Sequence, residues 1–207
     1  MGNHTTFAVG GPADVFILPH TVKEMSLAIR LAREADVPVT VLGGGSNVLF
    51  LDGGIRGIVI QLNEMNKFLS THENKILASA GFMLKDVCAF AQENALTGME
   101  FACGIPGTLG GAVFMNAGAY GGEMSHIVSR VRTVSRTGSV HSYAEGQFGF
   151  GYRQSIFQKL QEYVVEVELA LAPGKKEEIQ ATMDDLMERR RSKQPLEMNS
   201  AGSTFKR

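Results

Sequence analysis

The sequence contains little cysteine, no tryptophan and no surplus of charge of either sign. Only Cys88 and Cys103 carry thiols, and their spacing matches no metal or redox motif. The 20 basic residues nearly balance the 21 acidic residues, so the chain has no excess of positive charge to bind a nucleic-acid backbone or anionic lipid. These absences exclude a disulfide-rich scaffold, and we expect reduced thiols and no nucleic-acid partner.

Long apolar runs are absent as well. No segment approaches the roughly 20 consecutive apolar residues that a membrane span needs, and the N-terminus lacks the basic and then apolar segments of a secretory signal. The five histidines show no ligand spacing. We therefore expect a cytoplasmic protein with no membrane partner and no bound metal, and the 44% apolar content is ample for a packed core.

Glycine is the residue that the chain has in excess. There are 24 glycines among 207 residues, well above the typical level of about 7%. Six of them lie within residues 43–57 and eight within residues 98–122. Because glycine lacks a Cβ, such clusters mark places where the backbone turns sharply or approaches another group closely. The two clusters are therefore the first candidates for a binding site.

Hydrophobic patterning predicts a βαββ unit in the first 63 residues. Thr21 and Glu24 form a capping box, and apolar residues then recur at helical spacing. Short β-rich runs flank this helix. The strands are expected at residues 13–18, 37–42 and 55–62.

The rest of the chain predicts further strands and two longer helices, with no internal repeat and no low-complexity linker. The strands are expected near residues 67–70, 75–80, 127–134, 140–143 and 163–171. The helices are expected at residues 83–94 and 175–193.

The first glycine cluster begins with the sequence GGGSN at residues 43–47, directly after a predicted buried strand. Exposed backbone N–H groups in such a turn can bind an anion, and the Ser46 hydroxyl and Asn47 amide add donors. A diphosphate would suit this loop. The loop differs from the dinucleotide-binding fingerprint because no helix follows it, and a tight turn between strands is the alternative.

The second glycine cluster contains residues 104–123, GIPGTLGGAVFMNAGAYGGE. Thr108 can cap the segment that follows it, and the small residues at 110–112 cannot fill the space between elements. Asn116 adds an amide, and Tyr120 adds a ring with a hydroxyl. We expect a ligand to fill the space, with a purely structural crossover as the alternative.

Five segments, in this order, resemble the UDP-N-acetylenolpyruvoylglucosamine reductase family. They are NHTTFAVGGPAD (3–14), GGGSNVLF (43–50), the second glycine cluster (104–123), GYRQSIFQ (151–158) and SAGSTFKR (200–207). The two glycine clusters are shared with the wider group of flavin oxidases, whereas the last two segments are particular to the reductases. The resemblance runs from Asn3 to the last residue.

The resemblance implies an α+β fold of the two-subdomain FAD-binding kind found in vanillyl-alcohol oxidase and PCMH. On this basis residues 1–63 form the first FAD-binding subdomain and residues 64–174 the second. Residues 175–207 begin a substrate-binding domain.

The resemblance also implies FAD and NADPH as cofactors, with two FAD-binding segments. The segment along the diphosphate consists of Gly43, Gly44, Gly45, Ser46, Asn47, Val48 and Leu49. The segment along the flavin and its phosphates consists of Gly104, Ile105, Pro106, Gly107, Thr108, Gly110, Gly111, Ala112, Asn116, Gly118, Ala119 and Tyr120.

The implied reaction passes hydride from NADPH through FAD to the enolpyruvyl group of UDP-N-acetylenolpyruvoylglucosamine, which gives UDP-N-acetylmuramate for peptidoglycan precursors. Tyr152 and Arg153 match the family's catalytic motif, where a fixed guanidinium would stabilise charge on the enolpyruvyl carboxylate. Ser203 matches the family's proton donor. Lys206 and Arg207 are assigned to the substrate, a small-molecule UDP-sugar, and we expect a monomer. Without the other motifs, Tyr152 and Arg153 would indicate only an aromatic residue beside a surface arginine.

The chain departs from the family pattern near its end. The family carries a further catalytic glutamate and most of the substrate domain beyond the position of Arg207, and Met198 and Asn199 stand where a proline-containing lead-in is common. We expect a polypeptide of these 207 residues alone to bind flavin weakly and to show negligible turnover. No long insertion separates the Arg153 and Ser203 motifs, which resembles the shorter family subtype.

Two other functions remain open. An FAD-dependent oxidase of the same fold would act on another alcohol or sugar, but it would usually carry a histidine or cysteine that attaches the flavin, and nothing marks Cys103 for that role. A non-catalytic flavin-binding module would leave the Arg153 and Ser203 motifs without a purpose. The run at residues 189–191, three arginines near a predicted helix C-terminus, favours a solvated surface over a phosphate clamp.

Overall fold

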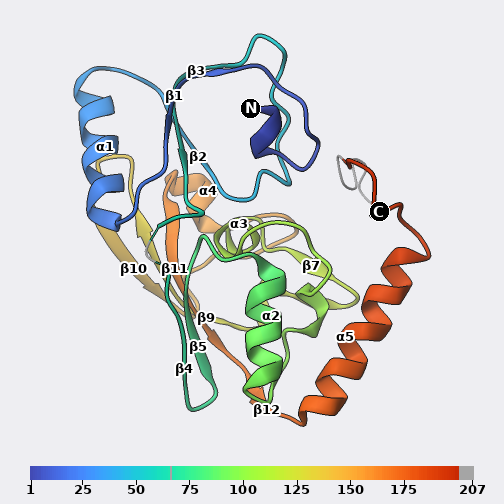
Figure 1. Ribbon diagram of the computed structural model, residues 1–207. Coiled ribbons are helices and arrows are strands. Elements are labelled where there is room, and N and C mark those ends of the chain that lie inside the picture. The colour runs from blue at the N-terminus through green and yellow to red at the C-terminus, as the bar shows by residue number, and fades with distance from the viewer. Residues whose placement is uncertain (66, 201–207) are drawn as a thin grey trace.

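A parallel three-stranded sheet forms from the N-terminal part of the chain (Figure 1). Its strand order is β1-β3-β2, and one helix connects β1 to β2. The elements are β1 (Ala13–Ile17), α1 (Val22–Glu34), β2 (Val39–Leu42) and β3 (Ile55–Gln61). The computed structural model describes residues 1–65 and 67–200, and it confirms the predicted βαββ order.

The start of α1 shows why this segment is helical. The Thr21 hydroxyl accepts a hydrogen bond from the Glu24 backbone N–H at 3.1 Å, and the Glu24 carboxylate accepts one from the His20 backbone N–H at 2.8 Å. The capping box is therefore confirmed, although its second bond goes to the residue before the cap. The bond from His20 lowers the pKa of Glu24, because it favours the charged carboxylate.

A five-stranded antiparallel sheet forms the larger part of the molecule (Figure 1). Its order is β10-β9-β11-β5-β4. The strands are β4 (Leu69–His72), β5 (Lys75–Ser79), β9 (Val128–Val134), β10 (Val140–Ala144) and β11 (Tyr163–Ala170). All five were predicted. Cross-strand ion pairs line the solvated face, where Glu168 contacts Lys75 at 3.0 Å and Arg130 at 2.7 Å.

Helices α2 (Leu84–Glu93) and α3 (Leu109–Phe114) cover the other face of the larger sheet (Figure 1). Val87 of α2, Leu109 of α3 and Val167 of β11 are fully buried in the core between them. Helix α5 (Lys176–Arg191) lies alongside α2. None of the helices described is long and apolar enough to cross a membrane.

The remaining described elements are short. Helix α4 (Ile156–Leu160) precedes β11. Three 3₁₀ turns and two pairs of two-residue strands complete the set: η1 (Gly2–His4), η2 (Glu100–Ala102), η3 (Met124–His126), β6 (Leu96–Thr97) with β12 (Ala172–Pro173), and β7 (Gly118–Ala119) with β8 (Gly122–Glu123).

A shared apolar cluster joins the two sheets. It combines Met25 and Ile29 of α1 and Ile60 of β3 with Val134 of β9 and Val165 of β11, all of which are at most 2% exposed. Burial of this size stabilises each side chain by about 1.5–3 kcal/mol relative to exposure. The two sheets are therefore packed together and do not act as separate bodies.

Helices α3 and α4 were not predicted, and α3 lies within the second glycine cluster. Its glycines let it approach β5 closely, because the Gly110 N–H donates to the Ala80 carbonyl at 2.9 Å. The prediction that Thr108 caps this segment is correct in placing Thr108 at the N-cap position, but wrong in expecting a capping hydrogen bond from its side chain. Thr108 is the N-cap residue, but its hydroxyl makes no capping hydrogen bond, and its oxygen lies next to Gly43.

Replacement of Gly110 tests this close packing. A Cβ at Gly110 would lie 2.6 Å from the Ala80 Cβ, so we expect Gly110→Ala to lower the free energy of unfolding by about 1–3 kcal/mol. The neighbouring Gly111→Ala is the control, because its Cβ would meet only the Thr108 hydroxyl oxygen at 3.5 Å. That variant should be unchanged or more stable by up to about 1 kcal/mol. Urea unfolding measures both, and equal effects would contradict the packing argument.

Cys88 gives the fold a defined response to alkaline pH. The thiol is 1% exposed and donates to the Met99 carbonyl at 3.4 Å, and burial raises its pKa above the ordinary value of 9.0. The folded protein therefore keeps a proton that the unfolded chain loses, so this contribution to stability is complete below pH 9 and is lost as the pH rises.

We expect Cys88→Ala to remove that response. Above about pH 9, the free energy of unfolding of the wild type should fall more steeply than that of the variant, by about 0.7 kcal/mol per pH unit at pH 9 and by nearly 1.4 kcal/mol per pH unit at about pH 10.5. Urea unfolding at several pH values measures the two slopes. Parallel slopes would show that the thiol ionises in the folded protein as it does in the unfolded chain.

Candidate active site

The two glycine clusters contact each other directly. The loop at residues 43–47 follows β2, and the loop before α3 packs against it. A Cβ at Gly43 would lie 2.3 Å from the Thr108 Oγ1, and a Cβ at Gly44 would lie 3.0 Å from the Gly107 Cα. Side chains at these positions would force the loops apart, so glycine is required on one side of this contact.

The N-terminal segment supports the first loop from behind. Gly45 is buried with φ +65°, and its carbonyl accepts a hydrogen bond from the Thr6 N–H at 3.2 Å. A Cβ at Gly45 would lie 2.1 Å from the His4 carbonyl oxygen. The motif at residues 3–14 therefore fixes the shape of the loop.

The backbone donors of the first loop are free to bind an anion. Within residues 1–65 and 67–200, none of the five N–H groups of residues 43–47 donates to a protein acceptor, and neither do those of Gly107 and Thr108. Because buried or half-buried N–H groups are normally paired, successive unpaired donors in a turn favour a negatively charged ligand. These groups fit a diphosphate.

Arg153 joins this loop from a distant part of the sequence. Residues 151 and 154 form a tight turn through two backbone hydrogen bonds of 3.0 and 3.1 Å. Arg153 lies in this turn with φ +52°, and its guanidinium donates to the Asn47 side-chain oxygen. Tyr152 beside it is 65% exposed. The structure thus brings Arg153 and the first glycine loop together.

Asn116 connects the second cluster to the same turn. Its side chain is buried, donates to the Gly151 carbonyl at 3.1 Å and accepts from the Ser125 N–H at 2.9 Å. Hydrogen bonds from Ser125 and then Asn116 lower the pKa of Glu123, because they favour its charged form. Both ends of the Asn116 amide are therefore occupied by protein groups.

Two residues of the site were not assigned from the sequence, although both lie in the motif GYRQSIFQ. Ser155 is fully buried and donates to the Phe114 carbonyl at 2.7 Å. Gln158 donates to the Phe114 carbonyl at 3.0 Å and to the Arg153 carbonyl at 3.1 Å. No sequence pattern marks them separately, because their partners are backbone carbonyls.

The structure does not bring every predicted site residue to this contact. Gly104 lies under α5, where a Cβ would meet the Arg190 Cδ at 3.0 Å. Ala112 is buried in α3, residues 118–119 form β7, and Tyr120 is 46% exposed with φ +52°. Of the others, Val48, Leu49 and Pro106 are exposed and Ile105 is half-buried against the core. Ser203, Lys206 and Arg207 lie outside the described residues.

Within residues 189–191, Arg189 and Arg191 are solvated, whereas Arg190 is half-buried beside Gly104. Arg189 pairs with Asp185 at 2.8 Å and Arg191 with Glu188 at 3.9 Å, both within α5 and both exposed. Among the described residues, no three His, Cys, Asp or Glu side chains are grouped so that they could hold a metal ion.

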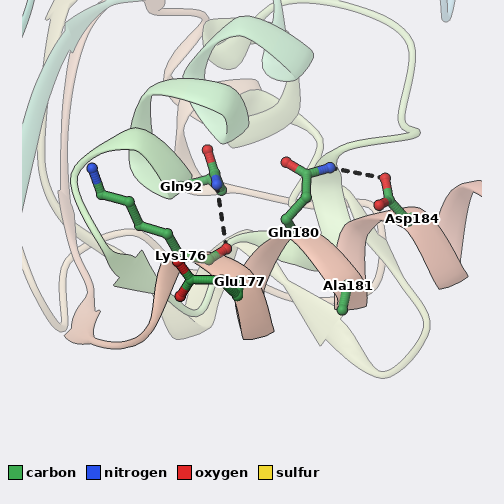
Figure 2. A pocket seen from close by; sticks show the side chains of 6 residues that line it. All are labelled: Gln92, Lys176, Glu177, Gln180, Ala181 and Asp184. Atoms are coloured by element: carbon green, nitrogen blue, oxygen red, sulfur yellow. Dashed lines mark hydrogen bonds between the residues drawn. The ribbon is translucent and has the colours of Figure 1, made fainter.

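Two hollows of the surface lie away from the paired glycine loops. One of about 520 Å³ lies between Gln92 of α2 and the first turns of α5, where Gln92 donates to the Lys176 carbonyl at 3.2 Å (Figure 2). Exposed polar side chains line it, and none of them converges on a common point. A second of about 340 Å³ lies beside β2 and α4. Residues 43–47 line neither hollow, so the candidate site rests on the paired loops and not on a cavity.

Comparison with known proteins agrees with this site. The FAD binding domain family matches residues 13–143. The UDP-N-acetylenolpyruvoylglucosamine reductase of Clostridium perfringens (strain SM101 / Type A) is 47% identical over 207 residues, which are 100% of this chain and 68% of that protein. The reductase of Geobacillus thermodenitrificans (strain NG80-2) is 46% identical over the same shares.

Solved structures give the same result. The UDP-N-acetylenolpyruvylglucosamine reductase from Thermus caldophilus superposes with a TM-score of 0.82 at 36% identity, covering 99% of this chain and 72% of that one. Phl p 4, a grass pollen allergen with glucose dehydrogenase activity, has a TM-score of 0.64 at 18% identity, covering 83% of this chain and 38% of that one. The latter likeness shows the fold alone.

The fold and the paired glycine loops define an FAD-dependent oxidoreductase of the two-subdomain FAD-binding class. Within that class, the chain belongs to the UDP-N-acetylenolpyruvoylglucosamine reductase family. The predicted fold class, family and FAD cofactor are thereby confirmed.

Gly45 tests whether the shape of the first loop controls FAD binding. We expect Gly45→Ala to weaken FAD binding at least about tenfold, because the residue has positive φ and its Cβ would overlap the His4 carbonyl. Gly53→Ala is the matched control, since a Cβ there would meet nothing within 4 Å. Titration of flavin fluorescence measures both. If both variants bound FAD with equal affinity, the shape of this loop would not control FAD binding.

Proposed function

We propose that this protein reduces the enolpyruvyl group of UDP-N-acetylenolpyruvoylglucosamine to give UDP-N-acetylmuramate, using NADPH and FAD. The observation that carries the proposal is the hydrogen bond from Arg153 to Asn47, which places a fixed guanidinium at the first loop of a flavin-binding fold. The names of the relatives support the substrate.

The residues at the paired loops fit FAD. The unpaired N–H groups of residues 43–47, with those of Gly107 and Thr108, would bind its diphosphate. When bound, FAD supplies the group that takes hydride from NADPH and gives it to the sugar nucleotide. The protein groups around it must then stabilise charge on the substrate and deliver a proton.

Arg153 is suited to the charged half of this task. Hydride addition at the β-carbon moves negative charge toward the enolpyruvyl carboxylate, and a guanidinium stabilises that charge more in the transition state than in the ground state. Its described partner, Asn47, is a neutral amide, and no carboxylate of the described residues pairs with Arg153. Its charge is therefore available to a substrate carboxylate. Tyr152 flanks the same position.

Ser203 would deliver the proton to the α-carbon, and Lys206 and Arg207 would contact the substrate. These assignments rest on the motif SAGSTFKR alone. A serine hydroxyl is a weak acid, so neighbouring hydrogen bonds and charges must activate it.

The domain division also belongs to the proposal. The parallel sheet lies within residues 1–63 and the antiparallel sheet within 64–174, which supports two FAD-binding subdomains. Residues 175–207 would begin the substrate-binding domain. We also propose a monomer, and a location in the cytoplasm, where nucleotide sugars are found.

The flavin spectrum tests the function. The absorbance of the full-length FAD-loaded protein near 450 nm is followed without oxygen while NADPH and then the sugar nucleotide are added. Bleaching by NADPH and recovery with the sugar nucleotide are expected. Recovery of the absorbance only on admission of oxygen would indicate an oxidase. If neither the sugar nucleotide nor oxygen restored the absorbance, a binding module would be indicated.

Substitution of Arg153 tests its role in the second half of the reaction. We expect Arg153→Met to slow reoxidation by the sugar nucleotide at least about 100-fold, because the lost charge acts mainly in the transition state, and to leave reduction by NADPH within about threefold. Stopped-flow absorbance measures each step. Arg191→Met, a loss of the same charge on the exposed face of α5, should change neither rate. Equal slowing of both steps would contradict the assignment.

A further inference from the structure

We propose that Gln158 is a positioning residue, which holds the turn carrying Arg153 against the end of α3 and so keeps the guanidinium at the flavin-binding loop. The expected effect on the reoxidation rate rests on the proposed function. The placement of Arg153 by Gln158 concerns only residues of this chain.

The turn that carries Arg153 does not hold its own shape. Arg153 has φ +52°, a region that residues with a Cβ seldom adopt unless the surroundings impose it. Two backbone hydrogen bonds between residues 151 and 154 close the turn. Arg153 is exposed, so packing does not fix it either. Contacts from outside the turn must therefore set its position.

Gln158 supplies those contacts with both hydrogens of its amide. One goes to the Phe114 carbonyl at 3.0 Å and the other to the Arg153 carbonyl at 3.1 Å. Phe114 is the last residue of α3, and the final carbonyls of a helix lack partners within it. The amide thus links the helix end to the strained residue itself, and its nitrogen also lies 3.4 Å from the Met115 Sδ.

Two neighbours hold the same turn at other points. Ser155 donates to the Phe114 carbonyl at 2.7 Å, and Asn116 donates to the Gly151 carbonyl at 3.1 Å. Both are buried, and their substitution would disturb the core. Gln158 is half-buried and is the member of the set that contacts Arg153 directly, so it can be replaced with less damage to folding.

Two substitutions separate positioning from packing. Gln158→Met keeps the length of the side chain and removes both donors, whereas Gln158→Lys keeps nitrogen donors one bond farther from the backbone on a flexible side chain. Gln92→Met is the matched control, since Gln92 of α2 also donates to a backbone carbonyl, that of Lys176 in α5, away from the turn of Arg153 (Figure 2). The full-length FAD-loaded protein is used throughout, and its melting temperature is recorded for each variant.

The test is a double-mutant cycle with Arg153→Met, read by FAD affinity and by the reoxidation rate. If Gln158 acts through Arg153, Gln158→Met should weaken FAD binding about threefold and slow reoxidation about tenfold in the wild-type background, and should have no further effect in the Arg153→Met background. Gln158→Lys should restore the reoxidation rate to within about threefold of the wild type, and Gln92→Met should leave the FAD affinity and the reoxidation rate unchanged.

The outcomes separate the positioning role from the proposed reaction. Effects that add in the two backgrounds, or a Gln158→Met protein that equals the wild type in both measurements, overturn the positioning role. Loss of activity in Gln158→Lys as well as in Gln158→Met, with lowered melting temperatures, also overturns it in favour of packing. If the sugar nucleotide fails to reoxidise the wild type while FAD affinity still shows the coupling, the proposed reaction fails and the positioning role stands.

Discussion

The close approach of two backbone loops is the constraint on which the rest of this structure depends. Gly43 and Gly44 at the end of β2 lie against Thr108 and Gly107 before α3, at distances that leave no room for a Cβ at Gly43. Because β2 belongs to the parallel sheet and α3 covers the antiparallel sheet, this contact fixes one sheet against the other. The apolar cluster around Ile60 and Val165 holds the same arrangement through the core.

Helix α3 connects this loop contact to the turn that contains Arg153. It has six residues and is therefore about 9 Å long. Its first end meets the glycine loop that would bind the diphosphate. Its last end, through Phe114, anchors the turn from which Arg153 reaches back to Asn47. A small helix thus sets the distance between the first glycine loop and the turn at residues 151–154 from which Arg153 reaches that loop.

The sequence predicted the regular elements well, because their signals are local. Alternating burial in β11 and the pairing of Thr21 with Glu24 need only a few neighbouring residues. Helix α3 was missed because two adjacent glycines argue against a helix, whereas packing of Gly110 against Ala80 and of Leu109 in the core favours one here. Asn116 acts through the Gly151 carbonyl 35 residues away, and Gln158 links the Arg153 carbonyl five residues away to the Phe114 carbonyl 44 residues away. No spacing within the sequence indicates such partners.

The fold alone does not determine which reaction the protein catalyses. Glucose dehydrogenases share this architecture at 18% identity, and oxidation of a neutral alcohol calls for a base near the flavin, whereas reduction of an enolpyruvyl carboxylate calls for a fixed cation and an acid. The glycine loops would serve either chemistry, because their unpaired N–H groups are proposed to bind the diphosphate of FAD and not the reacting carbon of the substrate. The turn at residues 151–154 is therefore the place where the described structure favours reduction. Arg153 is bonded there to the neutral amide of Asn47, so its charge is held in position without being neutralised.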